Sequence, residues 1–355
     1  MSEPVDGANR QTDGGRHLGM SIVTAVLLLA AIAALILWLI PANDYLLLPG
    51  QASQVAPMIS IAGHRAPPGG GNLYMTDVTL YKVDHYLEEL YGRFRSDGEL
   101  LPAREVAGTL NDTQYQQFNA CLMQSSIQDA EVAALSQVPG FHPRFSPNGP
   151  TIVCVLSGTP ASKLLRPGDI VEAVNGTRTL RALQISPVVH RVRPGEVVHL
   201  RLLRRDRLVT VTVRTIASTG GQPDPRGKTA LIGVQLMDEP VLPVRITINA
   251  GSIGGPSAGL MFALGIVQRL EKADLTHGCK VAGTGTIDGN GNVGPIGGAK
   301  QKIIAAQHAG ARYFLVPATP DNLGPARANR GSVTVVPVKT LSGALSFLRH
   351  LKPCR

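Results

Sequence analysis

The sequence predicts an α+β protein with an N-terminal transmembrane helix, a small β-rich domain and a C-terminal α+β domain. Residues 20–40 form an uncharged apolar run. Residues 138–217 alternate short apolar strands with turns that contain proline or glycine, and residues 230–352 alternate apolar helices and strands with glycine-rich loops. With 355 residues, the chain has room for about two globular domains beside a short anchor.

The apolar run at residues 20–40 is long enough to span a membrane, since about 20 residues cross a hydrocarbon core about 30 Å thick. A cleaved signal peptide is the alternative, but its apolar core is normally only ~7–15 residues and precedes a small-residue cleavage site. Here the run is longer and ends near Trp38, a residue type enriched at membrane interfaces, followed by Pro41. These features favour a retained anchor, so the membrane is an expected partner through residues 20–40.

The basic residues around this run predict its orientation. Arg10 and Arg16 precede it, and the next basic residue after it is Arg65. Because basic residues near a transmembrane helix remain on the cytoplasmic side, residues 1–19 are expected to be a cytoplasmic tail. Everything after about residue 41 is then extracytoplasmic, in a single-pass protein of the cell membrane.

Residues 41–137 are the least informative part of the sequence. Residues 72–80 alternate apolar and polar side chains like a strand, and residues 81–137 are polar and compatible with helices. No motif in them points to a chemistry. We expect an extracytoplasmic linking region of mixed α/β structure.

The β-rich part at residues 138–217 has a recognisable pattern. The string GTPASKLLRPGDIVEAVNG at residues 158–176 precedes a short helical stretch and RPGEVVHLRLLR at residues 193–204. This pattern resembles the core of PDZ domains, and an unrelated small β-barrel is the alternative. PDZ domains bind extended peptide tails by adding a strand to a sheet edge. The usual glycine–hydrophobic carboxylate-binding loop is not found at residues 138–217, so the mode of binding stays open.

Residues 249–259 (NAGSIGGPSAG) bring a glycine-rich backbone to Ser257 just before an apolar helix. A helix N-terminus and free N–H groups favour the negative charge of an oxyanion. Taken alone, this pattern is more often a simple helix cap. A second segment changes this interpretation: VAGTGTID at residues 281–288 leads to GPIGGAKQKIIAAQHAGARYFLVP at residues 294–317.

Together, GPSAG, GTG and the lysine-containing segment resemble the proteolytic domain of Lon proteases over residues 230–352, in the same order and with nearly the same spacing. With the anchor and the PDZ-like part, the whole chain resembles membrane-bound, PDZ-containing Lon-like proteins of bacteria. The resemblance implies a catalytic Ser257–Lys302 dyad, with Thr284 orienting the lysine. Backbone around Gly254, Gly255 and Pro256 would form the oxyanion loop. Soluble Lon enzymes carry an acid where this chain has Gly254, so no role for that acid is carried over.

Two lysines, Lys300 and Lys302, lie in this segment. In the Lon motif the second lysine is catalytic, which here is Lys302. The helical pattern agrees, because residues three or four apart share a face and Lys302 lies over Ala305 and Ala306. Lys300 is about 200° away at 100° per residue and is expected to point to solvent. A buried lysine can be neutral near pH 7, whereas an exposed one stays charged.

Charge and cysteine usage exclude other classes of function. The net charge is +9, but the basic residues are scattered and aromatics are only 4%, so we expect no nucleic-acid partner. The four cysteines form no CxxC pair and have no histidine at metal-ligand spacing, so no metal site is expected. Disulfides would form if the domains are exported, with the pairing left open. The simplest interpretation of Cys154 is a buried strand residue.

The expected activity is ATP-independent serine endopeptidase activity on proteins or peptides at the extracytoplasmic face. No G-x-x-x-x-G-K-[ST] motif occurs, so no ATP site and no cofactor are expected. GPSAG also satisfies the G-x-S-x-G elbow of α/β-hydrolases, but Asp288 and His308 belong to the Lon-like segments. The remaining alternative is a membrane-tethered PDZ scaffold with an inactive Lon-like domain. Substrate identity stays open, as does assembly into a homo-oligomer.

Overall fold

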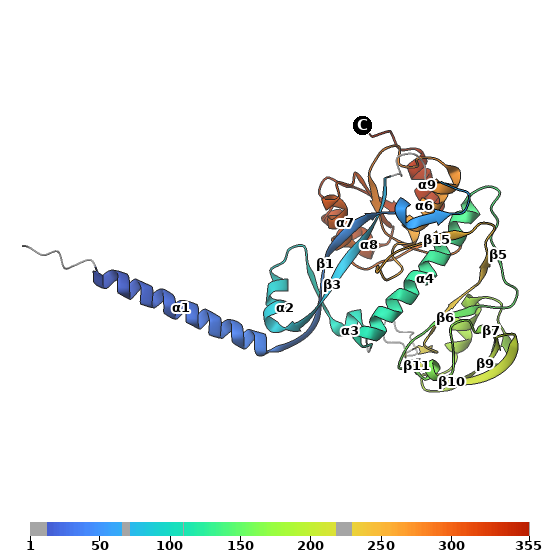
Figure 1. Cartoon of the computed structure of the whole chain (residues 1–355), viewed down its shortest axis with the longest axis horizontal. Coiled ribbons are helices and arrows are strands. Elements are labelled where there is room, and N and C mark those ends of the chain that lie inside the picture. Colours follow the sequence, from blue (N-terminus) through green and yellow to red (C-terminus); the bar gives the residue numbers. More distant parts are fainter. Residues whose placement is uncertain (1–12, 66–71, 109, 218–228, 355) are drawn as a thin grey trace, which may run out of the picture.

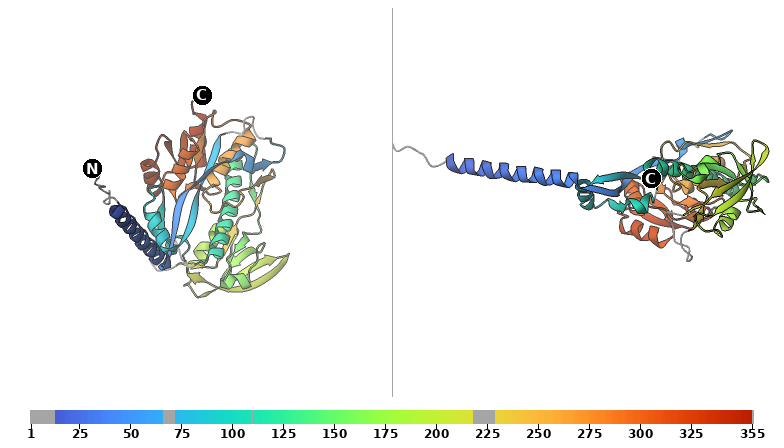
Figure 2. Two further views of the ribbon diagram at one scale, coloured as in Figure 1. Left: turned by 60° about the vertical axis from the view of Figure 1, so that its left-hand side comes forward. Right: turned by 90° about the horizontal axis from the view of Figure 1, so that it is seen from below.

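The computed structural model describes residues 13–65, 72–108, 110–217 and 229–354, with side chains from residue 22 onward. Helix α1 (Asp13–Leu39) projects from the folded body as a single rod (Figures 1 and 2). Its segment Ile22–Leu39 is, within the described residues, the one helix long and apolar enough to cross a membrane, and a signal sequence near the N-terminus would meet the same criterion. The chain then enters the body, where Trp38 stacks on His85 with 4.0 Å between ring centroids.

A six-stranded mixed sheet forms the centre of the larger domain, and the predicted α+β class is confirmed. Strands β3, β16, β19 and β20 are parallel, and β1 pairs antiparallel with β3 and with β4. The order across the sheet is β20 (Thr334–Val338), β19 (Tyr313–Pro317), β16 (Val281–Gly283), β3 (Leu73–His85), β1 (Pro41–Gln54) and β4 (Glu99–Pro102). Half of this sheet comes from residues 41–137, so the expected linking region is a structural part of the C-terminal domain.

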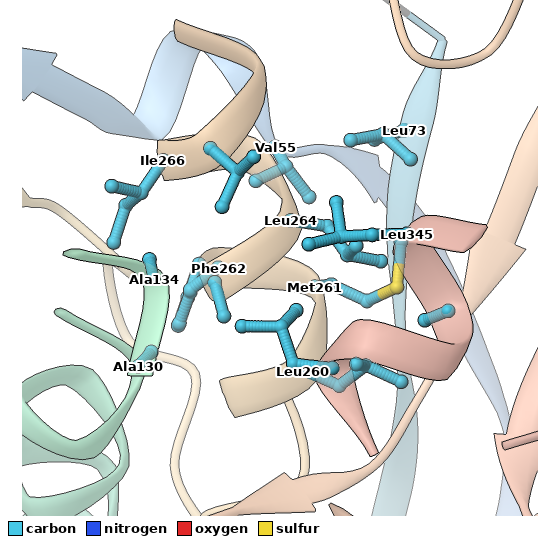
Figure 3. Packing of buried hydrophobic residues seen from close by; sticks show 14 of the residues in the cluster. Val55, Leu73, Ala130, Ala134, Leu260, Met261, Phe262, Leu264, Ile266 and Leu345 are labelled. Atoms are coloured by element: carbon cyan, nitrogen blue, oxygen red, sulfur yellow. The ribbon is translucent and has the colours of Figure 1, made fainter. Parts of the chain in front are cut away.

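Helices cover both faces of this sheet. On one face, α6 (Gly259–Glu271), α4 (Asp112–Gln137) and α9 (Leu341–Arg349) enclose the largest apolar core. Figure 3 shows Phe262 and Leu264 of α6 in this core, with Ala130 and Ala134 of α4 beside Phe262. The other face is covered by α7 (Ala299–His308) and α8 (Pro320–Ala328), which pack on Ala282 and Phe314. Because neighbours along a strand point to opposite faces, β16 contributes Val281 to one core and Ala282 to the other.

A second, smaller domain has its own sheet and its own apolar core. The strand order is β10 (Arg207–Arg214), β9 (Val197–Arg204), β7 (Ile170–Val174), β6 (Thr151–Val155) and β13 (Val234–Met237), with β8 (Thr177–Arg178) beside β7 and helix α5 (Ile185–Val189) against the sheet. Strand β13 lies beyond the expected end of this domain at residue 217. The sequence prediction missed it because a strand that completes a sheet from a distance has no local signature.

Short elements connect the two domains and complete their edges. The short strands among them form four two-stranded sheets, β15–β2, β14–β5, β11–β12 and β17–β18. Their bounds are η1 (Ala56–Met58), β2 (Ile59–Ile61), α2 (Tyr86–Arg93), α3 (Ala103–Val106), β5 (Arg144–Phe145), η2 (Pro160–Lys163), η3 (Ala182–Gln184), β11 (Ile216–Ala217), β12 (Ala230–Leu231), β14 (Pro240–Val241), β15 (Ile246–Ile248), β17 (Thr286–Ile287) and β18 (Val293–Gly294).

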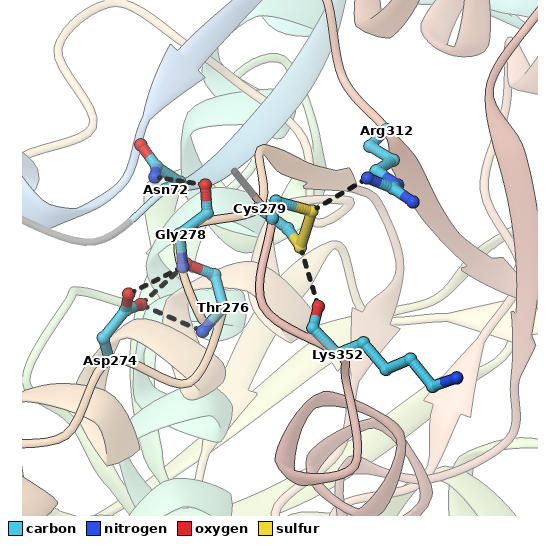
Figure 4. The surroundings of a disulfide bond; sticks show 8 residues. Asn72, Asp274, Thr276, Gly278, Cys279, Arg312 and Lys352 are labelled. Carbon is cyan, nitrogen blue, oxygen red and sulfur yellow. Dashed lines mark hydrogen bonds between the residues drawn. A yellow bond between two sulfur atoms is a disulfide. The ribbon is translucent and has the colours of Figure 1, made fainter.

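All four cysteines are paired in disulfides. Cys121 of α4 is bonded to Cys154 of β6, which ties the larger domain to the smaller one. Cys279, just before β16, is bonded to Cys354 near the C-terminus (Figure 4). Cys154 therefore lies in a strand as expected, but it is half-buried instead of buried, and its sulfur is paired in a disulfide.

The close packing at the end of β16 generates a prediction. A Cβ added at Gly283 would lie 2.6 Å from Met261 Sδ, 3.0 Å from Leu315 Cβ and 3.1 Å from the Leu315 carbonyl. Backbone of the neighbouring strand cannot move away cheaply, so Gly283→Ala should lower the free energy of unfolding by about 1–3 kcal/mol. Gly324→Ala, in α8 with open space around the added carbon, is the control and should be neutral or stabilising by up to about 1 kcal/mol. Equal thermal midpoints for the two variants would contradict this.

Candidate active site

Ser257 lies on the loop between β15 and α6, directly before the first turn of α6. Gly255 has φ +82°, a left-handed conformation that favours glycine. Helix α4 fixes the loop from behind: the Asn119 carbonyl accepts the Gly255 N–H at 2.8 Å, and the Ser126 hydroxyl donates to the Pro256 carbonyl at 2.8 Å. The serine is therefore held by a helix that the sequence had not linked to any chemistry.

Lys302 reaches the same point from the opposite face of the sheet. Helix α7 starts after Gly298, whose φ of +68° sets the entry into the helix, and Lys302 lies in the first turns. Its side chain is 3% exposed. The Nζ atom lies 2.7 Å from Ser257 Oγ and 3.3 Å from Thr284 Oγ1. The structure thus brings together the serine and the lysine that the sequence motifs single out.

Thr284 connects the two. It follows β16, is fully buried, and donates its hydroxyl to the Ser257 carbonyl at 3.1 Å while accepting from Lys302 Nζ. The Gly285 N–H donates to the same Ser257 carbonyl at 2.8 Å. One hydroxyl therefore contacts both the lysine and the backbone of the serine, which limits the positions that the amine can take.

Burial changes the acid–base properties of the lysine. Removal from water lowers the pKa of Lys302 from 10.5 to about 8, and the negative charge of Asp77 acts in the opposite direction. Both polar contacts of the amine, Ser257 and Thr284, are neutral hydroxyls. With a pKa of about 8, roughly a tenth of the amine is uncharged at pH 7, and this is the form that accepts a proton.

The serine and the lysine open onto a cavity of about 600 Å³. Its walls come from β1, from residues 75–80 of β3 and from the loop at residues 250–254. Strand β3 pairs with β16 only from Leu73 to Met75. Beyond Met75, the edge of β3 on the side away from β1 has no pairing with β16. Within the described residues, no group of three or more His, Cys, Asp or Glu side chains could hold a metal ion.

Two expectations about this site need correction. Lys300 does not project into solvent: it is half-buried and donates to the Gly98 carbonyl at 3.2 Å, because the turn before β4 packs against the start of α7. The Gly255 N–H is not free for an oxyanion, since Asn119 accepts it, and Pro256 has no N–H. Of the expected oxyanion loop, only the Gly254 N–H has no acceptor in the described part of the chain.

Other backbone donors near the nucleophile are unoccupied. The N–H groups of Ser257 and Ala258 also find no acceptor among the described residues. They belong to the turn that enters α6, where helix geometry leaves the first N–H groups unpaired. The sequence signal for these N–H groups was the position of Ser257 at a helix start. Nothing in the sequence indicated that Asn119 and Ser126 support the loop.

Comparison with known proteins agrees with the geometry. Residues 235–346 match the Lon protease (S16) C-terminal proteolytic domain, which confirms the predicted resemblance. The Lon protease of Roseiflexus castenholzii is 35% identical over 114 residues, which are 31% of this chain and 14% of that protein. Lon protease 2 of Bacillus subtilis is 45% identical over 65 residues, 18% of this chain and 11% of that protein. The chain thus spans only about a seventh or less of the length of these relatives.

Solved structures similar to the chain include a PDZ domain. The PDZ domain of the SdrC-like protein Lmo2051 from Listeria monocytogenes is 20% identical, covers 26% of this chain and 92% of its own, and has a TM-score of 0.23.

The buried amine predicts an unusual pH dependence of stability. Below about pH 8 the folded and unfolded states both bind the Lys302 proton, and the folded state bears the full cost of the buried charge. The gap between 10.5 and about 8 corresponds to about 3 kcal/mol. Lys302→Met should therefore be more stable than wild type at pH 7, with the advantage shrinking toward pH 10.5. Thermal midpoints of both proteins across this range check it, and a pH-independent difference would contradict it.

Proposed function

We propose that the chain, whose residues 235–346 match the Lon proteolytic domain, is a serine endopeptidase that hydrolyses peptide bonds with a Ser257–Lys302 dyad. The observation that carries this proposal is the 2.7 Å contact between Nζ of a buried lysine and Oγ of a serine on the wall of a cavity. A serine hydroxyl is a weak nucleophile unless an adjacent base takes its proton. The lowered pKa of Lys302 suits the lysine for that task.

The reaction follows from this contact. Neutral Lys302 takes the proton of Ser257 as Oγ attacks the peptide carbonyl, and the carbonyl oxygen becomes an oxyanion. The unpaired N–H groups of Gly254, Ser257 and Ala258 are the donors that we propose for this charge. When the C–N bond breaks, Lys302 returns the proton to the leaving amine, and water then hydrolyses the acyl-enzyme by the reverse sequence. Thr284 holds the amine in place through its hydroxyl.

The shape of the site suits an extended chain as the substrate. An extended peptide can pair its backbone with a strand edge, and the edge of β3 beyond Met75 borders the cavity beside Ser257. A second cavity of about 730 Å³ lies between the smaller domain, which contributes β13 and α5 to its lining, and α3 and α4 of the larger domain. We propose that this PDZ-like domain holds substrate tails and so raises their effective concentration near the dyad.

We further propose that cleavage needs no nucleotide and takes place outside the cytoplasm. The sequence contains no G-x-x-x-x-G-K-[ST] motif. Helix α1 has the length and composition of a membrane anchor, with Arg10 and Arg16 before it. The two disulfides also support a location of the folded body outside the cytoplasm, because disulfides persist in oxidising compartments.

The dyad makes a direct prediction for activity. Ser257→Ala and Lys302→Ala should each lower kcat/KM by about 10³-fold or more, because nucleophile and base act as one unit. In the wild type, kcat/KM should rise with pH and level off above about pH 8 as Lys302 loses its proton. The measurement is hydrolysis of an unfolded protein substrate by the full chain, from pH 6 to 10.

Lys300→Ala is the matched control, since Lys300 is on the same helix but bonds the Gly98 carbonyl outside the cavity. It should retain most of the activity. Loss of turnover in Lys300→Ala with full turnover in Lys302→Ala would refute the assignment. Cleavage that requires added ATP would refute nucleotide independence, full activity of Ser257→Ala would refute the dyad, and absence of cleavage by the wild type would favour the inactive-scaffold alternative.

The membrane arrangement predicts where the C-terminus lies. An epitope tag after residue 355 should be removed by protease added to intact spheroplasts, because the body lies outside the cytoplasm. Non-reducing peptide mapping of the same material should recover the Cys121–Cys154 and Cys279–Cys354 pairs. A tag that is degraded only after membrane lysis, together with reduced cysteines, would contradict the proposed topology.

A further inference from the structure

Asp77 is a charged residue of the active-site cavity that the dyad mechanism leaves unused. It lies on β3, and among the residues that line the cavity it is the one acid, as Lys302 is the one base. Its Oδ1 accepts the Gln51 N–H at 2.7 Å, at the bulge of β1. Gly50 allows this close approach, because a Cβ there would lie 1.9 Å from Oδ1. The carboxylate is therefore fixed in the wall by the backbone of a neighbouring strand.

The second oxygen of Asp77 has no hydrogen-bond partner among the described residues. Asp77 is half-buried, and a carboxylate oxygen without a protein partner is stabilised by a cation or by water in a space that faces it. The cavity supplies both, since Lys302 lies in its wall. Gly254, which directly precedes Gly255-Pro256-Ser257, offers no charge.

We propose that Asp77 is a positioning residue whose carboxylate is the counter-charge for Lys302 while the lysine carries the proton taken from Ser257. This inference rests on the proposed dyad. In the step concerned, the proton moves from Ser257 Oγ to Lys302 Nζ, the Oγ–carbon bond forms, and the carbonyl electron pair becomes the oxyanion. Asp77 gives and takes no proton. Its negative charge stabilises the ammonium ion that this step creates inside a buried site.

Among the described residues that line the cavity, no other side chain carries a charge. Helix α7 packs mainly against β1, β3, β19 and α8. Their remaining charged side chains, together with Lys300 of α7 itself, lie outside the cavity lining: Asp44, Lys82, Asp84, Asp321 and Arg327. Glu99 of β4 accepts from Gln301 at 3.3 Å and is also outside the lining. The protonated lysine would otherwise face only hydroxyl groups.

Asp77→Asn separates charge from structure, because an asparagine oxygen can still accept the Gln51 N–H. We expect kcat to fall about tenfold, equivalent to about 1.4 kcal/mol of transition-state stabilisation, with KM little changed. Loss of the negative charge makes the protonated lysine less stable, so the acid limb of kcat/KM should move to lower pH. A purely structural role for Asp77 would not move this limb. Asp84→Asn, on the same strand but outside the cavity, is the control and should leave kcat and the acid limb of kcat/KM unchanged.

A measurement without turnover separates this inference from the proposed function. The pH dependence of Lys302 labelling by a small amine-reactive reagent, followed by mass spectrometry, reports the protonation of that amine in the full chain. Labelling in Asp77→Asn should begin at lower pH than in wild type. An unchanged labelling profile overturns the role of Asp77 even if the dyad is active. A shifted profile in a chain with no Ser257-dependent cleavage would support the charge pairing and refute the peptidase.

Discussion

The burial of one amine sets the requirements for the rest of the larger domain. Burial is what lowers the pKa of this lysine, and it requires that packed elements cover the amine on all sides except the one that opens onto the cavity. Helix α7 provides the backbone that carries Lys302, the end of β16 provides Thr284, and the loop before α6 provides Ser257. Each of these is supported by another element, so the contact between Ser257 and Lys302 depends on residues well outside the sequence motifs that contain the pair.

The least informative residues of the sequence turn out to supply much of that support. Strands β1, β3 and β4 complete the central sheet, and α4 holds the nucleophile loop through Asn119 and Ser126. These residues act through backbone groups or single hydroxyls, which any of several side chains could supply. Patterns of side chains therefore cannot reveal them. Helix α4 also carries Cys121, so the same helix contacts the dyad loop and the smaller domain.

What the sequence predicted well was local or marked by unusual spacing. The spacing of GPSAG, GTG and GGAKQK indicated that Ser257, Thr284 and Lys302 should be considered together, and helical periodicity chose Lys302 over Lys300 for burial. The predictions failed where distant segments decide the outcome. Lys300 is covered by the turn at Gly98, the Gly255 N–H is taken by Asn119, and β13 joins a sheet that begins more than seventy residues earlier in the chain. None of these contacts has a counterpart in local pattern or composition.

The pairing of β3 with β16 also governs the order in which the chain can mature. Thr76 Oγ1 donates to the Gly283 carbonyl across a sequence separation of 207 residues, and the whole smaller domain lies between the two strands. The smaller domain gathers its strands from residues 151–237 and can assemble as soon as these residues emerge. The central sheet has to wait for β16, α7 and the strands after them, since closing so long a loop comes first. In a chain made from its N-terminus, the smaller domain can therefore be complete before Ser257, Thr284 and Lys302 are brought together.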